Sequence, residues 1–166
     1  MTKQTLFTTS IACALLALVT ISSCDQGPVF SEIPAIEFID IQPKEVRQWQ
    51  DSILVTFRFE DGDGDLGEAN DTSASIALID SRVNDGISER DATQTFRLPN
   101  LVSDAKNPSI QGEITVRIPF TVIRPPALAE TIRYEIRLWD QAGHAATPIN
   151  GDSDDGVFTD YIIITQ

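Results

Sequence analysis

Apolar and polar residues alternate along most of the chain after its first 34 residues. The run over 52–60 is the clearest, because Ile53, Val55, Phe57 and Phe59 are separated by mostly polar or charged residues. A period of two places successive side chains on opposite faces of a strand, so that one face can be buried and the other solvated. Further runs with strand character occupy 35–41, 75–82, 93–98, 113–121, 131–140 and 157–165.

Turn-forming segments rich in Gly, Pro, Asn and Asp separate these runs. They lie at 61–67, 84–86, 107–108, 125–126 and 150–156. No window contains a convincing amphipathic helix of useful length, and the stretch 127–130 could form one turn at most. About seven short strands without helices predict an all-β protein, with a β-sandwich as its architecture.

Two local motifs narrow the type of sandwich. Leu128 precedes Tyr134 by six residues at the entry to the sixth run, which is similar to the tyrosine corner of immunoglobulin-like and fibronectin type III domains. The segment from Asp140 to His144 resembles the F-strand ending Asp-x-x-Gly-Asn of bacterial immunoglobulin-like domains, with His144 in place of Asn. The resemblance covers 35–166 and implies an immunoglobulin-like antiparallel β-sandwich, whose tyrosine hydroxyl bonds back to the preceding corner. Another all-β sandwich is the alternative.

The first 23 residues have the three parts of an export signal. Lys3 provides a positive charge, and an apolar stretch over 6–21 follows. A membrane-spanning helix needs about 20 predominantly apolar residues. This stretch is shorter and is interrupted by polar residues at 8–10, so it predicts a cleaved signal peptide.

The signal ends in Ile21-Ser22-Ser23-Cys24, which resembles the bacterial lipobox. The resemblance implies cleavage before Cys24, a diacylglyceryl thioether on its sulfur and an acylated amino terminus. Several acyl chains anchor a protein stably, at about 0.8 kcal/mol per buried CH₂. We therefore expect a signal peptide over 1–23, a lipidated tether over 24–34 and a domain over 35–166. The expected location is the cell envelope, at the outer membrane of a Gram-negative bacterium; a plain secretory signal is the alternative.

Composition limits the partners and the means of stabilisation. The formal net charge is −13, which disfavours nucleic acid and favours cations or basic surfaces. Cys13 lies within the leader and Cys24 closes it, so the domain has no cysteine pair for the usual immunoglobulin disulfide.

The most chemically suggestive segment is the acidic turn after the second run. Asp61, Asp63 and Asp65 alternate with Gly62 and Gly64, which lets several carboxylates approach one point. The pattern departs from an EF-hand, because Leu and Thr occupy the sixth and twelfth positions counted from Asp61.

Topology predicts that a second acidic loop lies near the first. With strands lettered A to G, 61–67 begins the B–C loop and 140–156 forms the F–G loop, and these loops share one end of the sandwich. The hypothesis is a calcium site with Asp61, Asp63 and Asp65 as its centre, joined by ligands from the second loop. The candidate second-loop ligands are Asp140, Asp152 and Asp154. Solvated turns are the alternative.

No residue set indicates catalysis. His144 is the only histidine, no Gly-x-Ser-x-Gly turn is present, and the domain lacks the His and Cys residues of a zinc site. We expect no enzyme and interpret His144 as a turn residue, with an acidic glycoside hydrolase as a remote alternative.

The two tryptophans are further candidates for ligand contact. Trp139 falls on the strand face opposite Tyr134 and Leu138, where it could form an exposed platform, but partial burial under a loop or a swapped inward face is the reading we favour. Trp49 is expected to cover one end of the sandwich. The sequence thus favours an envelope-anchored, non-catalytic binding or structural module stabilised by calcium, with an envelope protein or glycan as partner. A carbohydrate-binding accessory lipoprotein using Trp139 is the alternative.

Overall fold

The computed structural model describes residues 28–67, 75–99, 101, 108–152 and 156–166. The predicted signal peptide, Cys24 and Asp154 lie outside the described residues. Among the residues described, no helix combines the length and the apolar character needed to cross a membrane.

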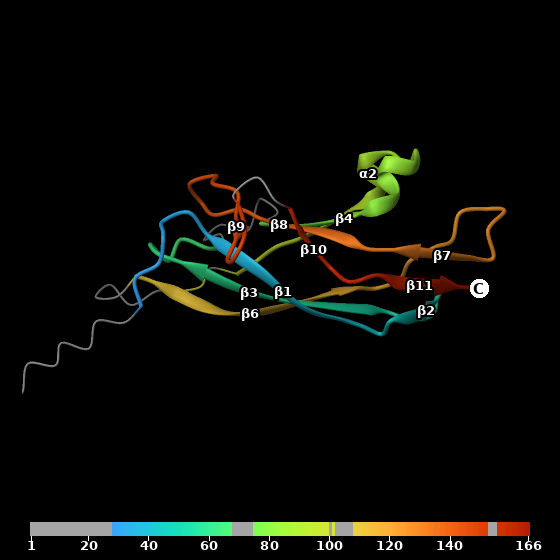
Figure 1. The fold of residues 1–166 in the computed structure, drawn as a ribbon, viewed down its shortest axis with the longest axis horizontal. Helices are drawn as coiled ribbons and strands as arrows, with labels where there is room; N and C mark the ends of the chain where they lie inside the picture. The colour runs from blue at the N-terminus through green and yellow to red at the C-terminus, as the bar shows by residue number, and fades with distance from the viewer. Residues whose placement is uncertain (1–27, 68–74, 100, 102–107, 153–155) are drawn as a thin grey trace, which may run out of the picture.

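The chain folds almost entirely into strands, as the alternating pattern predicts (Figure 1). One four-stranded sheet has the order β6-β3-β1-β9 and a second has the order β10-β8-β4-β5. The first sheet consists of β1 (Ala35–Gln42), β3 (Ile53–Asp61), β6 (Ile110–Ile118) and β9 (Thr147–Pro148). The second consists of β4 (Ile76–Asp80), β5 (Thr93–Phe96), β8 (Tyr134–Leu138) and β10 (Val157–Phe158).

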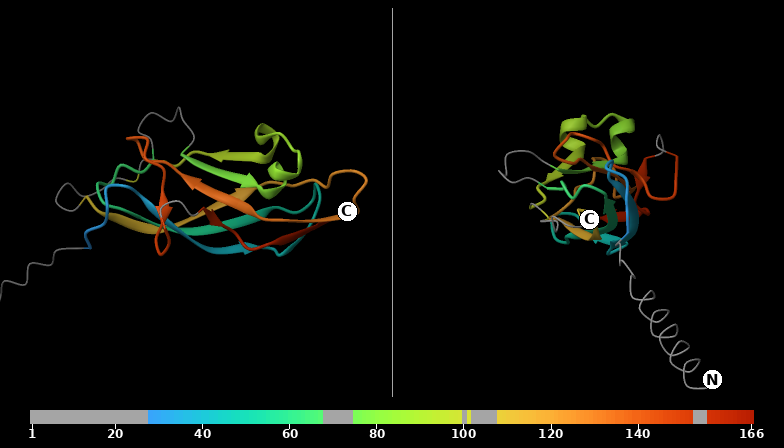
Figure 2. Two further views of the ribbon diagram at one scale, coloured as in Figure 1. Left: turned by 45° about the horizontal axis from the view of Figure 1, so that its top comes forward. Right: turned by 90° about the vertical axis from the view of Figure 1, so that its left-hand side faces the viewer.

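A smaller third sheet continues the structure at one end. Its order is β2-β11-β7, and β11 pairs in parallel with β2 and antiparallel with β7. Its strands are β2 (Glu45–Arg47), β7 (Ala129–Ile132) and β11 (Ile162–Thr165). The two larger sheets lie in separate layers (Figure 2), an arrangement compatible with the predicted β-sandwich.

The core lies where apolar faces of these sheets meet. In β3, Ile53, Val55 and Phe57 are fully buried, whereas the residues between them are half-buried or exposed, which confirms the predicted alternation. Leu78 and Ile136 of the second sheet belong to the same buried cluster. Burying such side chains stabilises the fold by about 1.5–3 kcal/mol each.

Two of the predicted strands are divided between sheets. The predicted run over 131–140 corresponds to two strands. The first, β7, lies in the third sheet and ends at Ile132, and the second, β8, lies in the second sheet and begins at Tyr134. The run over 157–165 divides in the same way into β10 and β11. At the crossing, the N–H of Thr159 donates to the carbonyl of Tyr134 (2.9 Å), and the N–H of Tyr134 donates to Thr159 Oγ1 (3.0 Å). These bonds satisfy the backbone where the chain changes sheets.

The predicted strand over 75–82 ends earlier than expected. The Asp80 carboxylate accepts from the N–H of Arg82 and caps the short helix η2 (Ser81–Asp85), which Gly86 ends at a φ of 92°. A further short helix, α2 (Glu89–Ala92), begins after Ser88, whose side chain accepts from the N–H of Asp91.

The tyrosine corner inferred from sequence is met only in part. Tyr134 is 2% exposed, and its hydroxyl hydrogen-bonds the side chain of Thr121, in the connection that precedes β7. Burial raises the pKa of Tyr134, the nearby charge of Asp80 adds to this, and the bond to Thr121 opposes it. Leu128, by contrast, is 73% exposed and does not pack into the corner.

Strand register defines two ends of the molecule. Asp61 pairs with Ile110 at one end of the first sheet, and Ile53 pairs with Ile118 at the other. The nine residues of β3 place these ends about 26 Å apart, at about 3.3 Å per step. We call the end at Asp61 the acidic pole, and the end that carries Trp49 and Phe120 the aromatic pole.

Candidate metal centre

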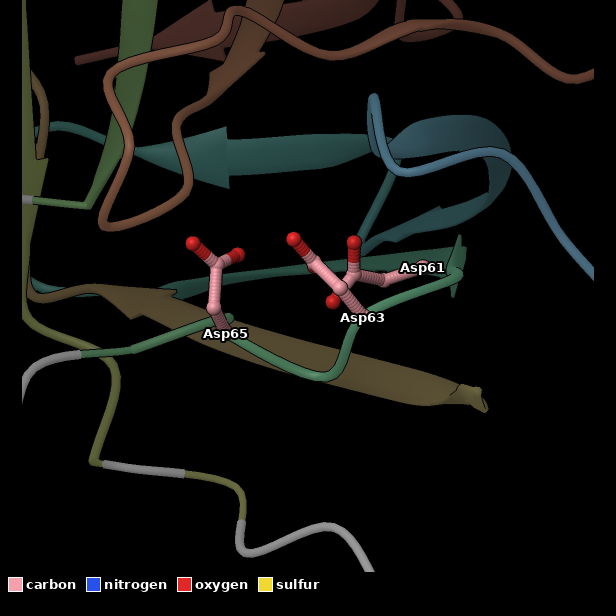
Figure 3. Close-up of side chains that lie close together, drawn as sticks. All are labelled: Asp61, Asp63 and Asp65. Atoms are coloured by element: carbon pink, nitrogen blue, oxygen red, sulfur yellow. The ribbon is translucent and has the colours of Figure 1, made fainter. Parts of the chain in front are cut away.

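Three aspartates converge where β3 ends. Asp61 is the last residue of β3, and Asp63 and Asp65 follow it in the turn (Figure 3). One carboxylate oxygen from each lies within 4.8 Å of the others. Gly64 adopts a φ of 70°, the left-handed conformation that glycine adopts most readily, and so lets the turn bring Asp63 and Asp65 back toward Asp61.

The turn also packs closely against the segment that precedes the domain. A Cβ at Gly62 would lie 2.5 Å from the carbonyl oxygen of Phe30 and 2.6 Å from that of Ser31. Only a residue without a side chain permits this approach. The predicted tether therefore enters the domain directly beside the aspartate cluster.

Asp61 is the buried member of the cluster. It is 0% exposed, and both of its carboxylate oxygens are buried without a hydrogen-bond partner, as is Oδ1 of Asp65. The N–H groups of Gly64 and Asp65 lie close enough to Asp61 to favour its charge somewhat, yet neither makes a hydrogen bond of normal geometry. A buried carboxylate without partners is costly unless it is protonated or binds a cation.

The electrostatics of the cluster agree with this geometry. Burial, followed by the charges of Asp63 and Asp65, raises the pKa of Asp61 to about 6. Burial also raises the pKa of Asp65, with further contributions from Asp140 and Asp63. Near neutral pH the cluster thus gathers negative charge that its own backbone does not neutralise.

The two predicted loops meet at this pole. Leu66 forms an antiparallel bridge with Asp140, and the N–H groups of Gln141 and Ala142 donate to Asp65, at its carbonyl oxygen and at Oδ2 respectively (both 3.2 Å). The chain segments after β3 and after β8 are therefore neighbours, as the topology argument required.

Asp140 lies beside the cluster but is engaged elsewhere. Its Oδ1 accepts from the N–H of His144 (2.7 Å), and its Oδ2 lies 2.8 Å from His144 Nδ1. Gly143, at a φ of 91°, completes this turn. His144 is therefore a turn residue, in agreement with the interpretation from sequence. The carboxylate of Asp140 acts on the cluster through its charge on Asp65.

The other predicted ligands stand apart or lie outside the described residues. Asp152 is exposed and, within the described part of the chain, is not among the acids whose oxygens share a point with Asp61. Its role, and that of Asp154, stay predictions.

The donor set suits a hard cation. Carboxylate oxygens are the ligands that Ca²⁺ prefers, and Ca²⁺ takes six to eight oxygens at about 2.3–2.6 Å. Asp61, Asp63 and Asp65 can provide three or more of these, with backbone carbonyls or water for the rest. Mg²⁺ also binds oxygen but requires stricter octahedral geometry and retains more water.

The partial burial of Trp139 agrees with the reading favoured from sequence, whereas Trp49, expected to cover one end of the sandwich, is largely exposed. Trp139 is half-buried, and its backbone N–H donates to the carbonyl of Ser75 (2.9 Å). The role of its side chain as a ligand platform stays a prediction. Trp49 is 65% exposed and packs against Phe120, itself 46% exposed, with ring centroids 4.9 Å apart. Sequence reasoning missed this pair, although polar neighbours on both sides of Trp49 were a usable signal of exposure.

Comparisons with known proteins assign no family to the chain. No family model matches it, and neither a curated protein nor a solved structure shows significant similarity to it. The class defined by the fold and the site is an all-β protein, compatible with a β-sandwich, that carries an acidic cluster at one pole.

Proposed function

We propose that the chain is an envelope-anchored lipoprotein whose all-β domain is a non-catalytic binding or structural module stabilised by calcium. The observation that carries the calcium site is Asp61, a fully buried carboxylate without partners that faces two further carboxylates. A bound cation would neutralise the cluster and join β3 to the loop after β8.

Strand order supports an immunoglobulin-like topology for this module. With β1, β3, β4, β6 and β8 lettered A, B, C, E and F, strands A, B and E share one sheet and C and F share the other. The last part of the chain serves as G, because β10 pairs with β8 and β11 pairs with β2. This division between sheets is that of immunoglobulin-like sandwiches.

We infer that the proposed anchor joins the domain at the end that carries the proposed calcium site. Phe30 and Ser31 contact the turn at Gly62, and Cys24 precedes them by only six residues. A cation at the cluster would stiffen the point at which the lipidated tether meets the sandwich. The acidic pole would then face the membrane.

Thermal unfolding of the full chain with calcium or chelator tests the cation site. Extracellular calcium modules bind at about 10⁻⁴–10⁻³ M, so about 10 mM calcium should stabilise the protein by roughly 1.4–2.7 kcal/mol. Asp63→Asn should lose most of this gain. Asp85→Asn is the matched control, because Asp85 is an exposed aspartate of η2 near the other pole, and it should keep the gain. An equal response in both variants would contradict the proposed site.

Membrane fractionation tests the anchor independently. The wild-type chain should partition with membranes, whereas Cys24→Ala should not become lipidated and should lose that partitioning. Retention of Cys24→Ala with full lipid labelling would exclude Cys24 as the lipidated residue.

A further inference from the structure

A small pocket lies at the aromatic pole, at the opposite end of the domain from the aspartate cluster. Its volume is about 180 Å³. Trp49 and Phe120 form its apolar side, and Tyr134 contributes to its lining. Its polar lining includes Arg82, Asp91 and Gln94. Aromatic rings provide apolar contact area and the polar groups can orient a ligand, which is the division of roles found in small-molecule sites.

The backbone holds Trp49 in an unusual conformation. Its φ of 64° is the only positive φ of a non-glycine residue in the described part of the chain. A bulky side chain in this region costs roughly 1–3 kcal/mol and persists only where its surroundings impose it.

Those surroundings are found in the turn itself. Arg47 donates to the Asp51 carboxylate through its backbone N–H (2.8 Å), Nε (3.0 Å) and Nη2 (2.9 Å). The N–H of Trp49 donates to the carbonyl of Thr121 (3.2 Å). These hydrogen bonds fix the turn in a conformation that exposes the Trp49 ring. That exposure is unfavourable both for the backbone, because of the positive φ, and for the apolar ring, because of the hydrophobic effect.

A buried ion-pair network makes the opposite wall rigid. Arg82 Nη2 lies 2.6 Å from Asp80 Oδ2, and Arg82 Nη1 lies 2.6 Å from Glu130 Oε2. Nη1 also donates to the carbonyl of Val122 (2.7 Å), and Arg124 Nε lies 2.6 Å from Glu130. A wall fixed before binding loses little conformational freedom when a ligand enters.

We propose that this pocket, with the Trp49–Phe120 pair as its platform, binds one ring of a neutral carbohydrate. The C–H face of a sugar ring can pack on exposed aromatic rings, while its hydroxyls can bond Asp91 and Gln94. The volume lies below the roughly 300–1,000 Å³ of drug-sized sites, which suits a single ring. A protein partner would typically cover about 800 Å² on each side, far more than two rings provide.

Charge excludes acidic sugars. The chain has a net charge of −13, and the guanidinium of Arg82 in the pocket lining is already shared by Asp80, which also lines the pocket, and by Glu130, which does not. A uronate or sulfated sugar would bring a further anion to this surface without a free counter-charge from that network. Neutral hexoses and pentoses meet no such penalty.

This inference builds on the proposed binding role, because it names the ligand class and the site. It does not depend on calcium. If the tether holds the acidic pole toward the membrane, the aromatic pole faces outward, about 26 Å away along β3. That is the direction from which an external glycan would arrive.

The test titrates the full chain with cellohexaose, maltohexaose, xylohexaose and mannohexaose by isothermal titration calorimetry, a readout that does not depend on Trp49. A zwitterionic detergent is used, because maltoside headgroups are themselves sugars. We expect at least one oligosaccharide to bind. Trp49→Gly, which also removes the backbone strain, should abolish binding, and Phe120→Ala should weaken it by about tenfold or more. Trp139→Phe is the matched control and should change affinity by less than roughly twofold.

Three outcomes would overturn the inference. These are no response to any of the four sugars, wild-type affinity in Trp49→Gly, and loss of binding in Trp139→Phe with Trp49→Gly unaffected. The calcium response is measured on the same samples. A retained calcium response without sugar binding rejects this inference alone, whereas sugar binding without a calcium response rejects the cation site alone.

Discussion

Replacing Asp61 by asparagine should have opposite effects on stability in chelator and in calcium. In chelator near pH 7.5, the wild-type protein must bury a charged carboxylate beside two others. Asparagine removes that charge, and its amide can donate to neighbouring carboxylate oxygens such as Asp65 Oδ1, which has no partner. The variant should then be the more stable protein.

The size of the effect follows from the pKa of Asp61. The ordinary value of 3.8 is raised to about 6, chiefly by burial and then by Asp63 and Asp65. Because the folded state binds this proton more tightly, its contribution is fully present below pH 3.8 and is lost as pH rises through about 6. A difference of about two units corresponds to at most about 3 kcal/mol, or roughly 12 °C in melting temperature for a domain of this size.

Thermal unfolding of wild type and Asp61→Asn, each in chelator and in calcium, provides the assay. The difference in chelator should shrink between about pH 7.5 and pH 4.5, because the wild-type carboxyl becomes protonated. In about 10 mM calcium the order should reverse, since only the wild type retains the full ligand set. The reasoning would be refuted if Asp61→Asn were destabilised in chelator by a similar amount at both pH values.

Two further substitutions test the structure around the two poles. Arg82→Met leaves Asp80 and Glu130 buried without their shared cation. We therefore expect denaturant titration to show a loss of about 3–5 kcal/mol in the free energy of unfolding. A loss below about 1 kcal/mol would show that the network is solvated. Gly62→Ala places a Cβ 2.5 Å from the carbonyl oxygen of Phe30, so proteolysis at the tether should accelerate and stability should fall by roughly 1–3 kcal/mol, whereas unchanged values would mean that the tether does not pack there.

The strands were largely predictable because one physical signal specifies them. Half-buried strands impose a period of two on the sequence, and β3 shows that period without interruption. The same signal cannot reveal a change of partner. Arg133 continues the alternation over 131–140, yet the chain leaves one sheet and enters another there, because pairing depends on neighbours distant in sequence.

The acidic site was predictable in its local part only. Asp61, Asp63 and Asp65 lie on one turn, so their spacing was enough to bring them together. Asp140 belongs to a separate turn, in which its two carboxylate oxygens contact the backbone N–H and the ring Nδ1 of His144. The exposure of Trp49 depends on a left-handed backbone conformation, which the residue type itself disfavours and which sequence patterns therefore do not indicate.

The shortness of β9 and β10 has a consequence for behaviour at high concentration. Each is two residues long and forms one border of a four-stranded sheet. Bare strand borders recruit strands from other molecules, and a border of two residues offers almost no backbone for such recruitment. Recruitment between crowded copies is therefore directed away from β9 and β10 and toward the longer borders, of which β6, at nine residues, is the longest.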